Sequence, residues 1–368
     1  MWEAPVKVQR TRFSVGLDVH ARSVLGCALD GDTGEVFERR LCPDHHEILE
    51  WITGLPAPVA VTYEAGPTGF GLARALTVAG IDCRVAAPSK LQRPAGDRVK
   101  TDARDAAHLA RLLHLGQIVE VAVPTVEQEA ARDVVRARED CRRDLLAARQ
   151  RVSKLLLRQG IVYSGGKAWT GRHQLWLQAQ RFDAVPLQWA YDTALDTLLA
   201  TLDRRDRLDA RIAELAIDSV YEPVVRRLMC LRGVSTLTAF GLAVEIGDWS
   251  RLTGRSIGAY VGLVPTESSS GATRSQGSIT KTGNGHVRRL LIEAAWHHRK
   301  PYQPGSPTLR RRWDAASPAA RARGQLANRR LYERWRRFDA RSKRAAVANT
   351  AIARELAGWC WSLAVLDN

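Results

Sequence analysis

No apolar run in this 368-residue chain is long enough to cross a membrane. A transmembrane helix needs about 18 or more predominantly apolar residues in succession, and every apolar run here is shorter. The first residues, Met-Trp-Glu-Ala-Pro, lack the basic and apolar regions of a signal peptide. We therefore expect a cytoplasmic protein with no membrane partner.

Cysteine is also scarce, and its spacing excludes two further classes of protein. The cysteines are scattered along the chain without a Cys-x-x-Cys pair, so the sequence indicates neither a zinc site nor a disulfide framework. We expect six reduced thiols, at Cys27, Cys42, Cys83, Cys141, Cys230 and Cys360.

Acidic residues are too few to balance the basic ones. The chain has 55 lysine and arginine residues against 39 aspartate and glutamate residues, which gives a formal net charge of +16. This excess favours a polyanionic partner, because each cation placed against a phosphate releases counterions.

The imbalance is greatest between residues 299 and 344. Only Asp314, Glu333 and Asp339 oppose its many basic residues, and aromatic residues such as Trp335 are interleaved with them. Because a solvated helix face is rarely so one-sided in charge, we favour nucleic-acid contact over that alternative. The arginines expected to make this contact are Arg329, Arg330, Arg336 and Arg337.

Strand and helix patterns alternate from residue 12 to about residue 120. Three meandering strands, a helix, and then alternating strands and helices favour an α/β layer domain of the ribonuclease-H-like type. The strands are expected at Phe13–Val19, Ser23–Leu29, Glu35–Leu41, Val59–Tyr63 and Cys83–Ala87. The helices are expected at His45–Thr53, Gly69–Ala79 and Asp105–Leu115.

Two long, sparsely apolar helices are predicted next, at Glu127–Arg158 and about Leu187–Leu215, with Gly165-Gly166 as the break between them. Neither buries much apolar surface alone, so we favour a helical hairpin or coiled-coil arm that packs on a partner. The alternative is an ordinary helical insertion within one chain. Further on, Arg232-Gly233-Val234-Ser235 before a helix at Leu237–Ile246 resembles a helix-hairpin-helix, with a simple packing unit as the alternative.

Four acidic residues occupy positions that suit metal binding. Asp18 and Glu64 each stand at the end of an apolar strand, and Asp102 and Asp105 open a helix one turn apart. Taken alone, Asp102 could be a helix N-cap and Asp105 a partner of the helix dipole. Taken together, the four carboxylates are what two Mg²⁺ ions about 4 Å apart require, with Asp18 bridging the ions.

A second candidate site lies in the last third of the chain. Ser268-Ser269-Ser270 stands directly before Gly271, and a Lys-Thr-Gly-Asn-Gly turn follows at residues 281–285. A serine run beside glycine is usually a flexible loop. Here the turn, with Lys281, Arg288 and Arg289, can hold a phosphate near a serine hydroxyl. Serine needs an activating group, and no histidine at suggestive spacing supplies the base.

These motifs together resemble the Piv-like DEDD transposases of bacterial insertion sequences, which are recombinases guided by a bridge RNA. The resemblance extends over nearly the whole chain. It is carried by Gly-Leu-Asp at 16–18, Tyr-Glu-Ala-Gly-Pro at 63–67, Lys-Thr-Asp-Ala-Arg-Asp-Ala at 100–106, Gly-Leu-Val-Pro at 262–265, Ser-Ser-Gly at 269–271 and Ile-Thr-Lys-Thr-Gly-Asn at 279–284, running on to Trp296.

The resemblance implies an architecture and a mechanism. It implies a RuvC-like domain at residues 1–122, a helical coiled-coil arm for dimerisation at 123–219, and a mainly α-helical transposase domain at 220–368. Asp18, Glu64, Asp102 and Asp105 would bind Mg²⁺, and Ser270 would be the nucleophile, with Ser269 as the neighbouring alternative. One active site would combine the acidic residues of one subunit with the serine of another.

The resemblance also implies the partners: double-stranded donor and target DNA, a guide RNA, and further copies of the chain, as a dimer that assembles to a tetramer in the bacterial nucleoid. Two other functions stay open. A metal-dependent junction endonuclease would use the acidic residues with water as the nucleophile, and it would leave no protein–DNA adduct. A catalytically silent nucleic-acid-binding protein would bind without Asp18 and Asp102.

Overall fold

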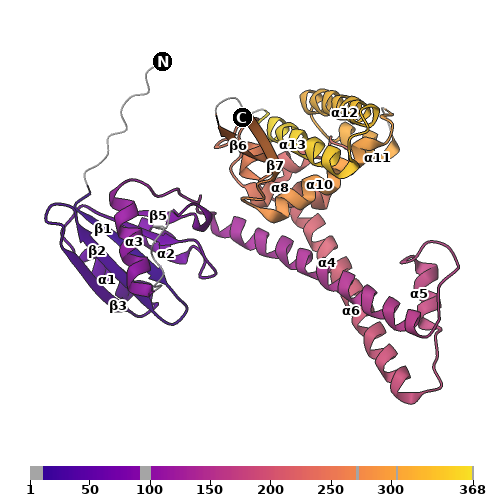
Figure 1. The fold of residues 1–368 in the computed structure, drawn as a ribbon, viewed down its shortest axis with the longest axis horizontal. Helices are drawn as coiled ribbons and strands as arrows, with labels where there is room; N and C mark the ends of the chain where they lie inside the picture. Colours follow the sequence, from indigo (N-terminus) through magenta and orange to yellow (C-terminus); the bar gives the residue numbers. More distant parts are fainter. Residues whose placement is uncertain (1–10, 92–100, 271–272, 304–305, 367–368) are drawn as a thin grey trace. The chain divides into compact units, whose positions relative to one another are not determined.

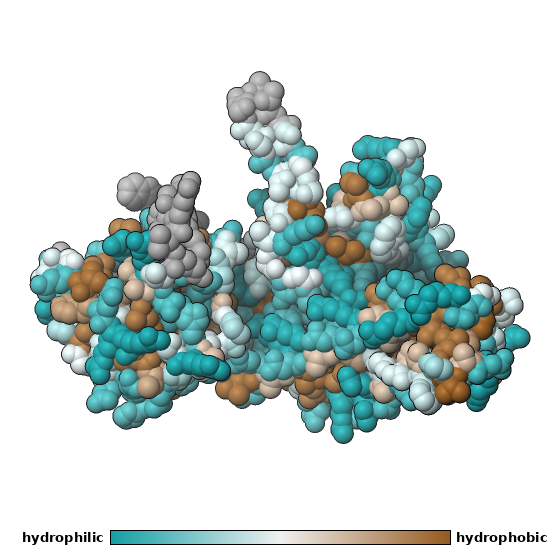
Figure 2. Space-filling view, turned by 60° about the horizontal axis from the view of Figure 1, so that its bottom comes forward, coloured by the Kyte–Doolittle hydropathy of each residue, from teal (hydrophilic) through white to brown (hydrophobic). Residues whose placement is uncertain are grey.

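The computed structural model describes residues 11–91, 101–270, 273–303 and 306–366. The chain divides into two compact units, residues 1–125 and residues 126–368. All six cysteines are free. Among the described residues, no helix has the length and apolar character needed to span a membrane. The face shown in Figure 2 is mostly hydrophilic, with apolar residues in small groups.

The first unit is built on a five-stranded sheet in the order β3-β2-β1-β4-β5 (Figure 1). The first three strands are antiparallel neighbours, and β1, β4 and β5 run parallel. The strands are β1 (Phe13–Val19), β2 (Val24–Asp30), β3 (Val36–Leu41), β4 (Val59–Glu64) and β5 (Asp82–Ala86). The helices are α1 (His45–Thr53), α2 (Gly71–Val78), the short 3-10 helix η1 (Pro88–Lys90) and α3 (Asp102–His114).

These elements confirm the predicted order of strands and helices, with ends shifted by a few residues. The largest shift is in α3, which begins at Asp102 because Thr101 caps it. The Thr101 hydroxyl accepts a hydrogen bond from the backbone N–H of Arg104, 3.3 Å away. The alternative that Asp102 is the N-cap is therefore wrong, and its carboxylate is not used for capping.

The central strands of the sheet are covered on both faces, and the alternation of side chains along β1 decides which helix covers which face. Val15 and Leu17 are buried in a core with residues of α1 and α2, such as Ile48 and Leu76. The intervening residues of β1 face α3. This helix packs on β1, β2 and β4 through a small cluster around Cys27, Ala106 and Ala110.

The second unit begins with a hairpin of two long helices, α4 (Val126–Arg158) and α6 (Val185–Ile217), which lie against each other (Figure 1). The sequence predicted both helices. Helix α4 ends at Arg158, where Gly160 adopts a left-handed conformation (φ 72°), and thus before the predicted break at Gly165-Gly166. The short helix α5 (Gly171–Gln178) was not predicted.

The hairpin has its own apolar core, formed by Leu145, Val152 and Leu156 of α4 with Tyr191 and Leu198 of α6. Its stripe of apolar residues is therefore covered largely within one chain. Packing of the arm on a partner stays a prediction, as do the bounds of the three domains.

The rest of the second unit is mainly helical around one core, with a two-stranded hairpin. Its helices are α7 (Glu222–Leu228), α8 (Thr236–Ile246), α9 (Ile257–Tyr260), α10 (Gly285–Ala295), the 3-10 helix η2 (Trp296–Arg299), α11 (Pro307–Asp314), α12 (Pro318–Ala340) and α13 (Ala345–Ala364). The strands are β6 (Pro265–Ser270) and β7 (Thr273–Ile279).

The arginine-rich segment forms α12, and Trp335 on this helix has a structural role. Its side chain is fully buried, and its indole N–H donates to the carbonyl of Ala295. The interpretation of Trp335 as an aromatic group interleaved in a nucleic-acid contact is therefore wrong. Its apolar neighbours recur at helical spacing (Ala327, Leu331) and place that face of α12 in the core.

Candidate active site

Asp18 and Glu64 stand at the ends of two neighbouring parallel strands. Leu17 of β1 lies opposite Tyr63 of β4, so the two acidic residues occupy the next position in each strand. Leu17 and Tyr63 face the core formed with α1 and α2. By alternation, Asp18 and Glu64 lie on the opposite face, the one that α3 covers.

Gly16 allows α3 to approach this face closely. A Cβ atom at Gly16 would lie 2.1 Å from the carbonyl oxygen of Ala106 and 2.5 Å from the backbone nitrogen of Ala110. Any side chain at position 16 would therefore push the helix away. The glycine of the Gly-Leu-Asp motif thus determines how closely α3 packs on β1. It thereby also determines the position of Asp102 relative to Asp18.

The structure gathers Asp18, Asp102 and one residue that the sequence analysis missed, His20. One potential ligand atom from each lies within 4.8 Å of the others. The Nε2 atom of His20 is 3.1 Å from Oδ2 of Asp18 and 3.9 Å from Oδ1 of Asp102. The sequence feature that could have indicated His20 is its spacing from Asp18 in Asp-Val-His at the end of β1. Residues two apart along a strand point to the same side, so His20 lies on the side of Asp18.

The other two predicted acidic residues lie around this group. Asp105, one turn after Asp102 on α3, is close enough to affect the charge of Asp18. Glu64 is exposed at the end of β4 and is not among the three gathered residues. The four predicted carboxylates thus share one end of the sheet, with Asp18 and Asp102 closest.

The carboxylate of Asp18 lies in an unfavourable environment for its charge. Burial raises its pKa, and the nearby charges of Asp102 and Asp105 raise it further, while His20 acts in the opposite direction. A partly buried carboxylate that neighbouring carboxylates repel is stabilised when a divalent cation binds between them. The donor set, two carboxylates with an imidazole nearby, therefore fits a metal ion.

The predicted serine run does not form a flexible loop. Residues 265–270 form β6, which pairs with β7 as an antiparallel hairpin, and Ser270 lies opposite Thr273 at its tip. Ser268 and Ser269 are exposed. The side chain of Ser270 and all of Gly271 fall outside the described residues. The interpretation as a loop is wrong because pairing with β7 holds the backbone of β6 in an extended conformation. Local composition does not indicate such pairing between strands.

A buried carboxylate, Glu245 of α8, contacts the turn at residues 281–285 and holds it in place. Its side chain is only 1% exposed. Arg136 of α4 donates to both of its oxygens at 3.0 Å, and the Asn284 side-chain amide donates at 2.7 Å. Nδ1 of His286 lies 3.3 Å away. Asn284 in turn caps α10, so Glu245 joins the arm, α8 and the turn.

Of the three predicted phosphate contacts around this turn, one is exposed and two have partners within the protein. Lys281 is exposed and has a left-handed backbone (φ 54°), which is unusual for a residue other than glycine. Arg288 donates to the carbonyls of Val261 and Thr282, both at 2.9 Å. Arg289 pairs with Glu139 and Glu293.

The four predicted arginines of α12 also divide into two groups. Arg329 pairs with Glu333, and Arg330 pairs with Glu355. Arg336 and Arg337 are exposed, and no carboxylate within the described ranges pairs with them. Nucleic-acid contact through all seven predicted basic residues stays a prediction.

Replacing Glu245 by glutamine is expected to destabilise the second unit in a pH-dependent way. Burial alone would raise the pKa of Glu245, but hydrogen bonds from His286, Arg136 and Asn284 lower it to about 2. Because this lies below the unfolded value, the stabilisation of about 3 kcal/mol is complete above about pH 5 and is lost as the pH falls towards 2. Urea unfolding should show a stability difference between wild type and Glu245→Gln near pH 7 that shrinks near pH 3. An equal difference at both pH values would contradict this assignment.

An acidic cluster at the end of a mixed sheet, in a chain with a net charge of +16, fits an enzyme that acts on nucleic acid. The comparisons with known proteins specify it further. A model described as "Transposase IS116/IS110/IS902 family" matches residues 225–309, and a DEDD model described as "Transposase" matches residues 15–160.

The chain also resembles two bacterial proteins over most of its length. It is 40% identical to "Putative transposase y4qE" of Sinorhizobium fredii, over 95% of this chain and 88% of that one. It is 31% identical to the transposase for insertion sequence element IS1533 of Leptospira borgpetersenii, over 91% and 99% of the two chains. The chain belongs to the IS110/IS116 family of transposases, enzymes that bind, cut and rejoin DNA.

Proposed function

We propose that this transposase mobilises an insertion sequence through a covalent phosphoserine link between Ser270 and DNA. The acidic tetrad Asp18, Glu64, Asp102 and Asp105 would bind Mg²⁺. The observation that carries the proposal is the close approach of Asp18 and Asp102, with ligand atoms inside a 4.8 Å group that also holds His20. A strand end and a capped helix start are rigid supports for such a site.

The acidic residues would hold Mg²⁺ and orient the DNA phosphate. Bound Mg²⁺ would supply a Lewis acid that stabilises negative charge on the phosphate oxygens. Asp18, partly buried and repelled by Asp102 and Asp105, gains most from a cation. His20 keeps one Asp18 oxygen in place by its contact at 3.1 Å.

The serine would perform the exchange of bonds. The Ser270 hydroxyl loses its proton as Oγ attacks phosphorus. A phosphorus–Oγ bond forms while the phosphorus–oxygen bond to the leaving strand breaks, and the leaving oxygen takes up a proton. No high-energy cofactor is required, because the phosphoserine link retains the energy of the phosphodiester for rejoining to a new strand end. Lys281, at the turn that follows β7, would contact backbone phosphate.

We propose further that the first unit is a ribonuclease-H-like domain of the RuvC type. Its strand order β3-β2-β1-β4-β5, with three antiparallel strands and two parallel additions, supports this. Specificity would come from a guide RNA. The arm would bring copies of the chain together, so that the tetrad of one subunit acts with Ser270 of another. The exposed Leu146 and Leu157 on α4 are available to such a partner.

The test combines the purified protein, the noncoding RNA that flanks its element, and end-labelled donor and target DNA with Mg²⁺. A denaturing protein gel should show a labelled protein–DNA adduct for wild type. The adduct should vanish in Ser270→Ala and persist in Ser269→Ala, a matched control one residue away on the same strand. Cleavage without an adduct in wild type would favour the junction endonuclease instead.

A further inference from the structure

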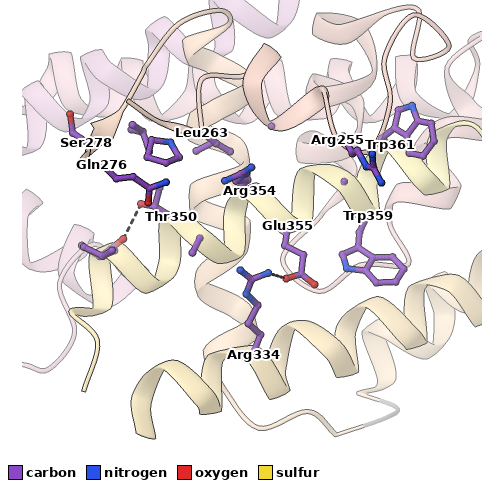
Figure 3. Close-up of a pocket in the computed structure, with 18 of the residues that line it drawn as sticks. Arg255, Leu263, Gln276, Ser278, Arg334, Thr350, Arg354, Glu355, Trp359 and Trp361 are labelled. Carbon is purple, nitrogen blue, oxygen red and sulfur yellow. Dashed lines mark hydrogen bonds and ion pairs between the residues drawn. The ribbon is translucent and has the colours of Figure 1, made fainter. Parts of the chain in front are cut away.

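A large basic groove lies in the second unit, beside the base of the β6–β7 hairpin (Figure 3). Its volume is about 1410 Å³, which exceeds the roughly 300–1,000 Å³ of typical small-molecule sites. One side is formed by residues 254–265 and by β7, and the other by α12 and α13. The groove is therefore large enough for an extended polymer.

Among the described residues that line this groove, five cations from four separate parts of the chain stand against a single carboxylate, Glu355. The cations are Arg255 before α9, Arg330 and Arg334 on α12, Lys343 in the following turn and Arg354 on α13. Cations that converge on a concave surface reinforce one another and attract an anion more strongly than scattered surface charges do.

The pairing of these cations is uneven. Glu355 is 13% exposed and pairs with both Arg330 and Arg334, as Figure 3 shows for Arg334. Arg255 and Arg354 are exposed, and neither pairs with a carboxylate within the described part of the chain. Two guanidinium groups in one groove repel each other when no carboxylate neutralises them. A bound polyanion would remove this repulsion, so the groove favours an external polyanion.

Aromatic and hydroxyl groups lie between the charges. Trp359 and Trp361 of α13 both line the groove. Trp361 is fixed there, because its indole N–H donates to the carbonyls of Trp249 and Leu252. Trp359 is half-buried, so part of its ring is accessible. Cations that follow a phosphate backbone, with aromatic rings against which bases stack, are typical of single-strand binding.

We propose that this groove binds a single strand of nucleic acid, a few nucleotides long, next to the hairpin that carries Ser270. Arg255 and Arg354 would contact its phosphates, and Trp359 would contact a base. The groove walls would enclose a single strand, whereas a duplex would meet only its rim. The proposal uses the DNA-processing role of the family, but it is independent of the phosphoserine mechanism.

The test measures equilibrium binding of the full chain, without added metal ion, to fluorescent 12-nucleotide probes of single-stranded DNA, single-stranded RNA and duplex DNA. The double variant Arg255→Ala/Arg354→Ala should weaken single-strand binding about tenfold near 0.15 M salt. It should also lower the slope of log affinity against log salt by about 1.4, which is two phosphate contacts at roughly 0.7 each. Duplex binding should change less.

The matched control removes two exposed positive charges outside the groove, in Arg151→Ala/Lys154→Ala on α4. It should change single-strand affinity less than about twofold. Equal losses for the control and groove variants, equal losses for duplex and single strand, or no loss at all would each overturn the proposal. Tighter binding of the DNA or of the RNA probe supports the groove and identifies the natural strand.

The variant Glu355→Gln tests the proposal by an expected gain in affinity for the single strand. Misfolding would weaken binding and therefore cannot produce this gain. Removing the one carboxylate found among the described residues that line the groove leaves all five cations in place and raises the local positive charge. Single-strand binding should therefore become about threefold tighter at low salt, and the gain should disappear as salt increases. Weaker binding by this variant with an unchanged melting temperature would contradict the proposal.

Discussion

Asp18→Asn is expected to abolish strand cleavage and adduct formation while the protein stays folded. The carboxylate of Asp18 lies at the centre of the proposed metal site. One of its oxygens and one potential ligand atom each of Asp102 and His20 lie within 4.8 Å of one another. A metal that contributes several kcal/mol of charge stabilisation corresponds to a loss of at least about a thousandfold in rate. Rates from labelled DNA substrates in excess Mg²⁺ measure the effect.

Although Asp18→Asn should lose activity, it should not lose stability. Because burial and the charges of Asp102 and Asp105 raise the pKa of Asp18 above its unfolded value, the charge of its carboxylate destabilises the folded protein at pH values above the folded pKa. The neutral asparagine should therefore leave the melting temperature unchanged or higher. Added Mg²⁺ should raise the melting temperature of wild type and not that of Asp18→Asn. Asp82→Asn, on the exposed start of β5, is the control. An active, Mg²⁺-responsive Asp18→Asn would refute the metal site.

Gly16→Ala is expected to lower the stability of the first unit by about 3 kcal/mol, the upper part of the range for overpacking. The added Cβ would meet backbone atoms of α3 at 2.1 and 2.5 Å, which no change of rotamer relieves. Helix α3 must move away from β1 and carry Asp102 and Asp105 with it. Urea unfolding measures the loss of stability, and the Mg²⁺-induced shift in melting temperature measures the loss of the site.

Gly54→Ala is the matched glycine control in the same unit. A Cβ atom at Gly54 meets its neighbours at ordinary distances of 3.4 Å or more, and its backbone is right-handed (φ −72°). This variant should be nearly as stable as wild type and should respond to Mg²⁺ in the same way. If Gly16→Ala behaves like Gly54→Ala, the close approach of α3 to β1 does not position the acidic residues.

The sequence predicted the first unit well because its signals are local. The runs Phe13–Val19 and Val59–Tyr63 are apolar and β-branched, and turn residues bound them, so their strands could be placed almost to the residue. Helix α3 was placed three residues late. It begins at Asp102 because the N-cap is Thr101 and not Asp102, and only the backbone geometry shows which of the two residues caps the helix.

The features that escaped prediction depend on contacts between distant residues. Glu245 appeared as one more residue of an apolar helix, yet it binds Arg136, more than one hundred residues earlier in the chain. Trp335 stood among arginines but faces the core. The groove joins residues from 254 to 362, and no local pattern reports such a convergence. Tertiary packing decides all three.

Mass spectrometry of the trapped protein–DNA complex tests the central claim most directly. After nuclease and trypsin digestion, cleavage following Arg255 and Arg274 releases the peptide 256–274, which contains the whole serine run. Our account predicts a residual nucleotide on this peptide, attached through phosphate to Ser270, and its absence when Mg²⁺ is omitted. An unmodified peptide from a reaction in which DNA has been cut, or a nucleotide on another residue, would contradict the phosphoserine mechanism.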